Sequence, residues 1–264
     1  MNYLFSDPKD LTMALGLGAK EHVAIVGAGG KTSLMFALAE ELRMHGGRVV
    51  TGTTTKVWYK EATRFACVII SRSDSAWQEK VRKDLEKYGH VFVGQGVLES
   101  GKLEGIGPAL AEKLYHDSVV DYLILEADGA AGLPVKAPAS HEPVIPPSVT
   151  LVVAMMGLEA VGKDLEPAFV FRLERFKEVT GLVNGEKINS KALGKIFHSP
   201  KGLFKGTPVS ARRVAFLNKL DLLPDDQEAK DLANLLLGPP NALIERVVIG
   251  SIKEKKFLII REKL

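Results

Sequence analysis

A glycine-rich loop joins an apolar run to a helical pattern near the N-terminus, and this arrangement leaves few folds open to the chain. The run His22–Val26 leads into the loop, and Lys31–Met44 carries leucines at helical spacing. The loop consists of Gly27, Ala28, Gly29, Gly30, Lys31, Thr32 and Ser33. Glycines let successive N–H groups turn inward, and a helix N-terminus adds donors and the positive end of its dipole. The pattern predicts a phosphate-binding loop in which Lys31 reaches the β- and γ-phosphates and Thr32 ligates Mg²⁺.

The loop departs from the common pattern G-x-x-x-x-G-K-[ST], because Ile25 stands where that pattern has its first glycine. It has the shorter form G-x-x-G-K-T, which also occurs in Mur-type ligases. An ordinary glycine-rich turn is the simplest alternative, but the strand before it and the helix after it favour phosphate binding. A dinucleotide-binding Rossmann loop fits less well, since Thr32 occupies its third glycine position and no acid ends the second strand.

Short apolar runs alternate with helical patterns along most of the chain. The runs expected to form strands are His22–Val26, Arg48–Thr51, Phe65–Ile70, His90–Val93, Tyr122–Leu125, Val149–Ala154, Val214–Leu217 and Ile244–Ile249. The patterns expected to form helices are Lys31–Met44, Asp74–Tyr88, Pro108–His116 and Asp225–Leu237. Unbroken apolar strands separated by helices predict an α/β fold, P-loop NTPase-like, with a mostly parallel sheet covered by helices on both faces.

The stretch from about residue 158 to 210 has a different character. Two helical patterns, Arg172–Thr180 and Ser190–His198, are interrupted there by glycines and prolines. We expect a helical insertion at this place, before the strand Val214–Leu217, within a single nucleotide-binding domain that spans residues 1–264. The last segment, KEKKFLIIREKL, reads as an edge strand flanked by charge.

The tetrapeptide Asn218-Lys219-Leu220-Asp221 directly follows one of the expected strands. It matches N-K-x-D, the guanine-recognition motif of P-loop GTPases. An aspartate carboxylate accepts hydrogen bonds from both N1–H and the exocyclic amine of guanine, whereas adenine does not offer these donors in that arrangement. The lysine stem would lie along the base, and Asn218 would brace the loop. The alternative is a turn in which Asn218 caps the strand and Asp221 opens a helix. The tripeptide Gly250-Ser251-Ile252 is a weak candidate for the loop that closes over the base.

Acids follow the expected strand Tyr122–Leu125, namely Glu126 and Asp128, and Gly129 comes next. An acid after a buried strand suits a role in holding Mg²⁺ beside a bound nucleotide. Glu126 is the first choice for this role and Asp128 the second, although either acid alone would also serve as a turn cap. A glycine three residues after Glu126 suits a loop that senses the γ-phosphate through its backbone N–H.

A proline-rich segment without periodicity, DGAAGLPVKAPASHEPVIPP, continues from this strand. Structureless segments of this length inside a compact domain usually have a function. Lys136 is a candidate for stabilising transition-state charge, and His141 for an acid, base or metal ligand, although a single histidine in a loop is more often a surface residue. The threonines in Thr51–Lys56 offer hydroxyls to Mg²⁺ or substrate, but threonine is also simply a common strand residue.

Composition excludes several classes of protein. The net charge of +3, from 35 Lys+Arg against 32 Asp+Glu, is too small to predict a nucleic-acid partner. A single cysteine excludes a disulfide framework and a multi-cysteine zinc site. The first ten residues lack the basic and apolar regions of a secretory signal, and no apolar stretch approaches the ~20 residues that span a bilayer. We therefore expect a cytoplasmic protein without a membrane partner.

Several blocks together resemble the YqeC-type family, whose members are described as accessory proteins of selenium-dependent molybdenum hydroxylases. The blocks are VGAGGKTS, TGTTTKVW, LILEADGAAGLPVKAPASHEPVIP, MGLEAVGKDL and FLNKLDLL. The similarity runs from about residue 20 to the C-terminus, and the third block is the most specific. The resemblance implies a role in maturing such a hydroxylase or its cofactor, with a client or maturation protein as partner. It also draws attention to Lys136, Pro138, His141, Glu142 and Pro143.

The sequence thus predicts a Mg²⁺-dependent nucleotide-binding protein with GTP favoured over ATP. Catalytic candidates are Lys31, Glu126, Asp128, Lys136 and His141, and metal-ligand candidates are Thr32, Glu126 and Asp128. No glutamine or arginine is identifiable as a water-orienting or charge-stabilising group, so hydrolysis is expected to be slow. Two alternatives remain: an ATP-dependent ligase or kinase acting on a small molecule, and a non-hydrolysing binder of a nucleotide-bearing molybdenum cofactor.

Overall fold

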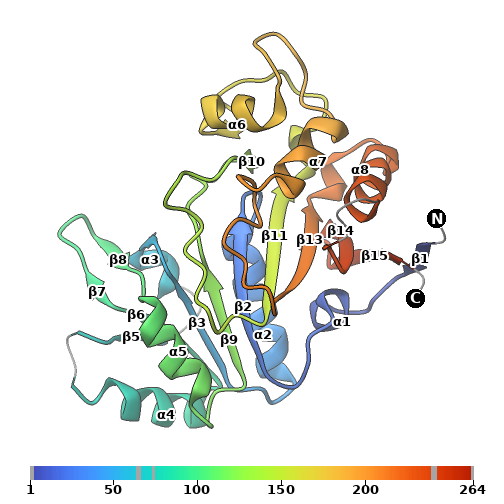
Figure 1. The fold of residues 1–264 in the computed structure, drawn as a ribbon. Helices are drawn as coiled ribbons and strands as arrows, with labels where there is room; N and C mark the ends of the chain where they lie inside the picture. The colour runs from blue at the N-terminus through green and yellow to red at the C-terminus, as the bar shows by residue number, and fades with distance from the viewer. Residues whose placement is uncertain (1–2, 64–66, 73–74, 239–242, 263–264) are drawn as a thin grey trace.

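A computed structural model describes residues 3–63, 67–72, 75–238 and 243–262, arranged around one large sheet (Figure 1). The strands of this sheet are β1 (Tyr3–Ser6), β2 (Glu21–Gly27), β3 (Val49–Thr53), β5 (Cys67–Ile70), β6 (His90–Gly94), β9 (Tyr122–Glu126), β11 (Leu151–Gly157), β13 (Arg212–Asn218), β14 (Arg246–Ser251) and β15 (Lys256–Glu262). The helices are α1 (Leu11–Leu15), α2 (Lys31–Met44), α3 (Tyr59–Ala62), α4 (Trp77–Tyr88), α5 (Pro108–His116), α6 (Leu173–Thr180), α7 (Ser190–His198) and α8 (Gln227–Leu237).

The strand order is β1-β15-β14-β13-β11-β2-β9-β3-β6-β5. Every neighbouring pair from β14 to β5 is parallel, and only the pairs that involve β15 are antiparallel. The predicted mostly parallel α/β sheet is therefore confirmed. Two of the expected elements begin outside the described residues: the strand at Phe65 and the helix at Asp74.

The expectation that the C-terminal strand forms an edge is wrong. β15 lies between β14 and β1, because Tyr3–Ser6 pairs antiparallel with its outer side. Figure 1 shows the two chain ends close together at this side of the molecule. A four-residue strand whose partner lies at the opposite end of the chain leaves no local periodicity from which to predict it.

Side chains alternate between two faces along the central strands, and helices cover both faces. Val23 and Ile25 of β2 pack with α1 and α2, whereas Ala24 and Val26 pack in a second core with α7 and α8. A third core joins β3, β6 and β9 to α4 and α5. Burial on both faces explains why these strands read as unbroken apolar runs.

The segment between β11 and β13 contains the 3₁₀ turn η1 (Leu158–Ala160), β12 (Val170–Phe171), α6 and α7. Its apolar side chains, among them Phe176, Ile196 and Phe197, belong to the same core as Ala24 and Val26 of the central strand. The segment therefore extends the sheet's own core. β12 also pairs with β10 (Val135–Lys136) from the proline-rich segment.

Three short strands form a separate antiparallel sheet beside β3, which we call the flap: β4 (Lys56–Trp58), β8 (Lys102–Glu104) and β7 (Gly96–Val97). Figure 1 shows β7 and β8 on the opposite side of the molecule from the chain ends. Among the described residues, no helix is long and apolar enough to cross a membrane.

Candidate functional site

The glycine-rich loop has the local geometry of a phosphate cradle. Gly27, Gly29 and Gly30 all have positive φ, between 75° and 122°, and α2 begins immediately afterwards at Lys31. Leu34 N–H donates to the carbonyl of Gly30 at 2.9 Å, and the amides of residues 31–33 precede it at the helix start. Helix-start amides have no acceptor within their own helix. Gly27, Ala28 and Gly29 donate their N–H groups to protein acceptors, so it is the start of α2 that offers N–H groups and the positive dipole end to a ligand.

All three glycines are restricted by space as well as by φ, and a Cβ on Gly27 would lie 2.2 Å from the carbonyl oxygen of Met155 in β11. A Cβ on Gly29 would lie 2.1 Å from the backbone nitrogen of Gly157 at the end of β11. A Cβ on Gly30 would lie 2.7 Å from the side-chain amide of Asn218. The loop is thus closely packed against the ends of β11 and β13, which fixes its position relative to the base-recognition motif.

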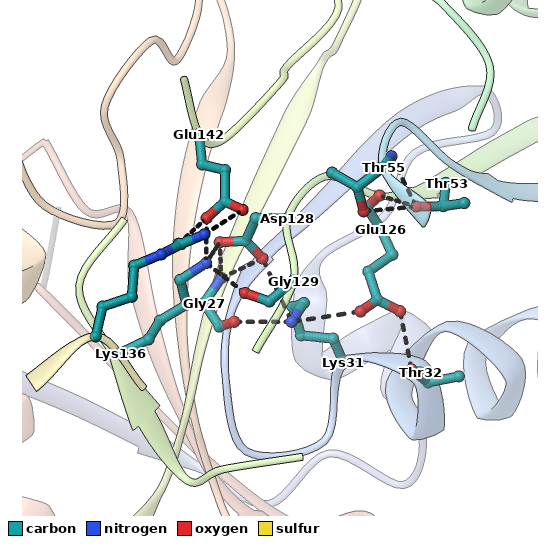
Figure 2. A network of polar contacts seen from close by, with 11 residues as sticks. Gly27, Lys31, Thr32, Thr53, Thr55, Glu126, Asp128, Gly129, Lys136 and Glu142 are labelled. Carbon is teal, nitrogen blue, oxygen red and sulfur yellow. Dashed lines mark hydrogen bonds and ion pairs between the residues drawn. The ribbon is translucent and has the colours of Figure 1, made fainter. Parts of the chain in front are cut away.

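Lys31 is buried at the centre of the site (Figure 2). Its Nζ donates to the carbonyl of Gly27 at 2.8 Å and lies 3.3 Å from carboxylate oxygens of both Glu126 and Asp128. Burial by itself would lower the pKa of Lys31, but the two carboxylates outweigh it and raise the pKa above its ordinary value. Lys31 is therefore protonated in the chain without nucleotide.

The two candidate acids have different surroundings. Glu126 accepts a hydrogen bond from the Thr32 hydroxyl at 2.8 Å and lies at the open side of the site. Asp128 is fully buried, and its two oxygens accept the N–H of Gly27 at 3.1 and 3.0 Å. Glu126 is thus accessible to a ligand or metal, whereas Asp128 holds the base of the loop in place.

Asp128 continues into a buried network of ions. Lys136 Nζ donates to Asp128 at 2.9 Å, to Glu142 at 2.8 Å and to the carbonyl of Gly129 (Figure 2). Arg172, before α6, donates to both oxygens of Glu142. Burial by itself would raise the pKa of Glu142, but the hydrogen bonds from Arg172 and Lys136 outweigh it and hold the pKa at about 2. The network joins the loop, the proline-rich segment and the segment before α6.

The N-K-x-D tetrapeptide lies next to the loop. The Asn218 side chain donates to the carbonyl of Gly29 at 2.8 Å and accepts the N–H of Ile252 at 3.2 Å. Asn218 therefore connects the loop to the Gly250–Ile252 turn. Lys219 has a positive φ and forms an ion pair with Glu159 of η1. Asp221 is exposed on the short turn η2 (Leu220–Leu222).

A cavity of about 770 Å³ opens over the phosphate loop and Glu126. Residues of the phosphate loop, of the segment after β9 and of the base motif line this cavity. They include Gly29, Gly30, Lys31, Thr32, Ser33, Glu126, Gly129, Glu142 and Lys219. Neither Asp221 nor His141 belongs to the described lining, and the His141 side chain is 75% exposed. The structure thus brings most of the predicted site residues together and places Lys136 and Asp128 beneath the cavity, where other chain atoms surround them.

Sequence reasoning missed part of the lining. Lys56, Val57 and Trp58 of β4, Lys102 of β8 and Phe171 of β12 also border the cavity. The signals for this part were the hydroxyl run that ends β3, of which Thr53 and Thr55 reach the lining, and the block TGTTTKVW, which spans residues 51–58. The strands β4 and β8 lie far apart in the sequence and are three residues long, so the pattern did not reveal their pairing.

Within the described residues, no group of three or more His, Cys, Asp and Glu side chains could hold a metal ion alone. The hydroxyl of Thr32 and the carboxylate of Glu126 are nevertheless the hard oxygen donors that suit Mg²⁺. Mg²⁺ generally keeps several waters and takes other ligands from substrate phosphates, so one hydroxyl ligand and a carboxylate that reaches its water shell fit it.

Comparison with known proteins decides the family. The family model described as YqeC protein matches residues 23–174. A relative from Escherichia coli (strain K12), described as "Uncharacterized protein YqeC", is 31% identical over 257 residues and covers 94% of both chains. This chain belongs to the YqeC family.

A solved structure also overlaps with this YqeC-family chain. Chloroplast FtsY from Physcomitrella patens aligns with a TM-score of 0.38 and 12% sequence identity, over 88% of this chain and 60% of that one. The chain thus spans less than two thirds of the length of that structure. At this TM-score the overlap adds nothing to the description of the site.

Proposed function

We propose that this chain binds a nucleoside triphosphate together with Mg²⁺ at the loop Gly27–Ser33. One observation carries the proposal: Lys31 and Thr32, at the start of α2, both contact Glu126, and all three residues line the cavity. Lys31 and Thr32 are the residue types that bind phosphate oxygens and Mg²⁺ in phosphate loops. A bound triphosphate would take over the ammonium charge that Glu126 and Asp128 now neutralise.

Guanine is the favoured base. Asn218 connects the phosphate loop to the turn at Ile252, which supports a base site formed by the Asn218–Asp221 tetrapeptide and that turn. The exposed Asp221 carboxylate is available to accept the two guanine donors. A carboxylate that pairs with N1–H and the exocyclic amine would disfavour adenine, because the same carboxylate would face adenine's N1 acceptor.

Hydrolysis is proposed to be slow. The described lining of the cavity contains no arginine, histidine or glutamine, so it offers no arginine finger and no glutamine to orient water. Backbone amides at the start of α2, together with the side chains of Lys31 and Thr32, would hold the phosphates, and Mg²⁺ would supply charge stabilisation when bound. Glu126 would contact the metal through its water shell. A client protein or second substrate would then accelerate turnover.

The maturation of a selenium-dependent molybdenum hydroxylase remains our proposal for the cellular context, and it rests on the family resemblance. A second candidate function is an ATP-dependent ligase or kinase acting on a small molecule. The specific observation in its favour is that the cavity continues past the phosphate loop to the flap. Tight binding of a nucleotide-bearing cofactor without turnover is the remaining alternative.

Isothermal titration of GTP and ATP, each with Mg²⁺, tests the nucleotide proposal. We expect tighter binding of GTP, and Asp221→Asn should remove that preference while Asp7→Asn, the same change at an exposed position beyond β1, should not. Lys31→Ala should weaken both nucleotides by about 100-fold, the equivalent of ~2.7 kcal/mol. Equal GTP and ATP affinities in wild type would contradict the proposed guanine specificity. Unchanged nucleotide affinity in Lys31→Ala would contradict the proposed phosphate site.

A further inference from the structure

The sheet order assigns the two sides of the cavity to different roles. β2, which ends in the phosphate loop, has β11 and β13 on one side and β9 and β3 on the other. The base motif follows β13, whereas the flap follows β3. A nucleotide with its phosphates on the loop and its base at Asn218–Asp221 therefore extends away from the flap. The flap side of the cavity lies beyond the terminal phosphate.

The flap turns a basic and aromatic surface toward this space. Trp58 of β4 is directly opposite Lys102 of β8, and Val57 is opposite the fully buried Leu103. Alternation along the strand places Lys56 on the same face as Trp58. All three of these outward side chains line the cavity. Trp58 is 46% exposed, although it is the largest apolar side chain in the lining.

Glu104 of β8 lies directly opposite Lys56 but forms its ion pair with Arg72, so neither flap lysine has an ion-pair partner among the described residues. Lys102 Nζ lies 4.8 Å from the centroid of the Trp58 ring, in a cation–π contact. In the described part of the chain, no carboxylate lies within ion-pair distance of Lys56 or Lys102. The other cavity lysines differ, because Lys31 pairs with Glu126 and Lys219 pairs with Glu159. Two ammonium groups without an ion-pair partner among the described residues, beside a partly exposed indole ring, favour an anion attached to a planar ring.

The flap is hydrogen-bonded to the end of the sheet that carries Glu126. Ile106 N–H, just after β8, donates to the carbonyl of Thr53 at 2.8 Å. The Thr53 hydroxyl and the Thr54 N–H both donate to the carbonyl of Glu126, at 2.9 and 3.0 Å. Trp58 and Lys102 are thus held at a set position relative to Glu126 and the phosphate loop. A ligand on the flap would lie next to the terminal phosphate.

We propose that Lys56, Trp58 and Lys102 form a second binding site, for a small molecule that carries an anionic group on a planar ring. The ring stacks on Trp58, and the anion is held by Lys56 and Lys102. The cavity of about 770 Å³ is shared by the phosphate loop and the flap, and the flap residues line one part of it. The position of this site beside the terminal phosphate rests on the proposed function, but binding at the flap does not require a nucleotide.

The test uses tryptophan fluorescence of Trp77→Phe, a variant in which Trp58 is the only remaining tryptophan. The protein is first loaded with Mg²⁺ and a non-hydrolysable GTP analogue, and loading is verified by calorimetry. Phenyl phosphate, phenol and inorganic phosphate are then titrated separately. We expect saturable quenching by phenyl phosphate at a concentration about tenfold lower than by either of the other two, because only phenyl phosphate combines ring and charge.

Variants separate this site from the nucleotide site. Lys102→Ala and Lys56→Ala, in the Trp77→Phe background, should each weaken phenyl phosphate binding about fivefold without changing nucleotide affinity. Lys113→Ala, at an exposed position of α5, is the matched control. Lys31→Ala, titrated without nucleotide, should retain phenyl phosphate binding.

Each failure has its own signature. If Lys102→Ala and Lys56→Ala leave phenyl phosphate binding unchanged, or if inorganic phosphate competes equally well, the flap site is overturned. If the loading step fails while phenyl phosphate still binds through Lys102, the nucleotide proposal fails and the flap site stands. Loss of phenyl phosphate binding in Lys31→Ala alone would place the probe in the phosphate loop and overturn the flap assignment.

Discussion

At the scale of single residues, Lys136 shows how a sequence candidate acquires a different role in three dimensions. Its ammonium group has three acceptors, Asp128, Glu142 and the carbonyl of Gly129, so its three donors are all used. The side chain is fully buried. Its position therefore indicates that Lys136 neutralises two carboxylates and anchors the proline-rich segment to the phosphate loop. A direct contact with substrate would require at least one of these bonds to break.

Lys136→Met tests this role at the residue scale. Methionine has a similar length but no charge, so the fully buried Asp128 would lose the nearer of its two lysine partners and keep only Lys31. Breaking a buried ion pair from one side typically costs about 3–5 kcal/mol, and we expect a loss of that size in the free energy of unfolding. Urea unfolding measures it, with Lys113→Met at an exposed helix position as the control. A loss as small as that of the control would contradict a structural role for Lys136.

At the scale of elements, the end of β13 holds the site together. Asn218 connects the phosphate loop before α2 to the turn after β14. Its partners in these two segments, Gly29 and Ile252, lie 189 and 34 residues away from it in the chain. Among the described residues, no other residue of the base motif forms a hydrogen bond with the phosphate loop or with this turn. The tetrapeptide therefore acts first as a brace and second as a base-recognition surface.

Asn218→Ala should loosen this brace. The variant leaves the carbonyl of Gly29 and the N–H of Ile252 without their partner, at a cost of about 1–3 kcal/mol in unfolding free energy. We also expect weaker nucleotide binding, because the loop would no longer be held at the orientation that its amides need. Chemical denaturation and calorimetry measure the two effects. Asn234→Ala, on the exposed face of α8, is the matched control. Full nucleotide affinity in Asn218→Ala would show that the loop is held without it.

Elements also show what the sequence could predict. The bounds of α2 and α5 coincide with the patterns, because each has a clear start signal, a glycine loop before Lys31 and a proline at the first position of α5. The flap and β1 were missed, because strands of two to four residues carry too few positions for alternation to be recognised. The ion pair of Glu142 with Arg172 spans thirty residues and depends on where the chain places the residues before α6. Such contacts are set by tertiary packing, which local spacing does not encode.

At the scale of the whole molecule, two buried histidines make the stability of the fold depend on pH. His22 on β2 and His90 on β6 are both buried, and burial lowers their pKa values to about 3 and about 4. His22 contacts Ser148 through Nδ1 at 3.1 Å, and its Nε2 is buried without a hydrogen-bond partner. Both rings are therefore neutral in the folded chain. In the unfolded chain they take up a proton near pH 6.5.

The sign of the effect follows from this difference in proton uptake. As pH falls from about 6.5 toward 4, the unfolded chain binds protons that the folded chain excludes, so the unfolding free energy decreases. Each histidine contributes up to about 1.4 kcal/mol per pH unit in this window. His22→Phe removes one titrating ring, and we expect its loss of stability between pH 7.5 and pH 5 to be smaller than that of wild type. Urea unfolding at the two pH values measures it. His141→Phe, the same change at an exposed ring, should behave as wild type, and equal losses in all three proteins would show that His22 protonates without unfolding.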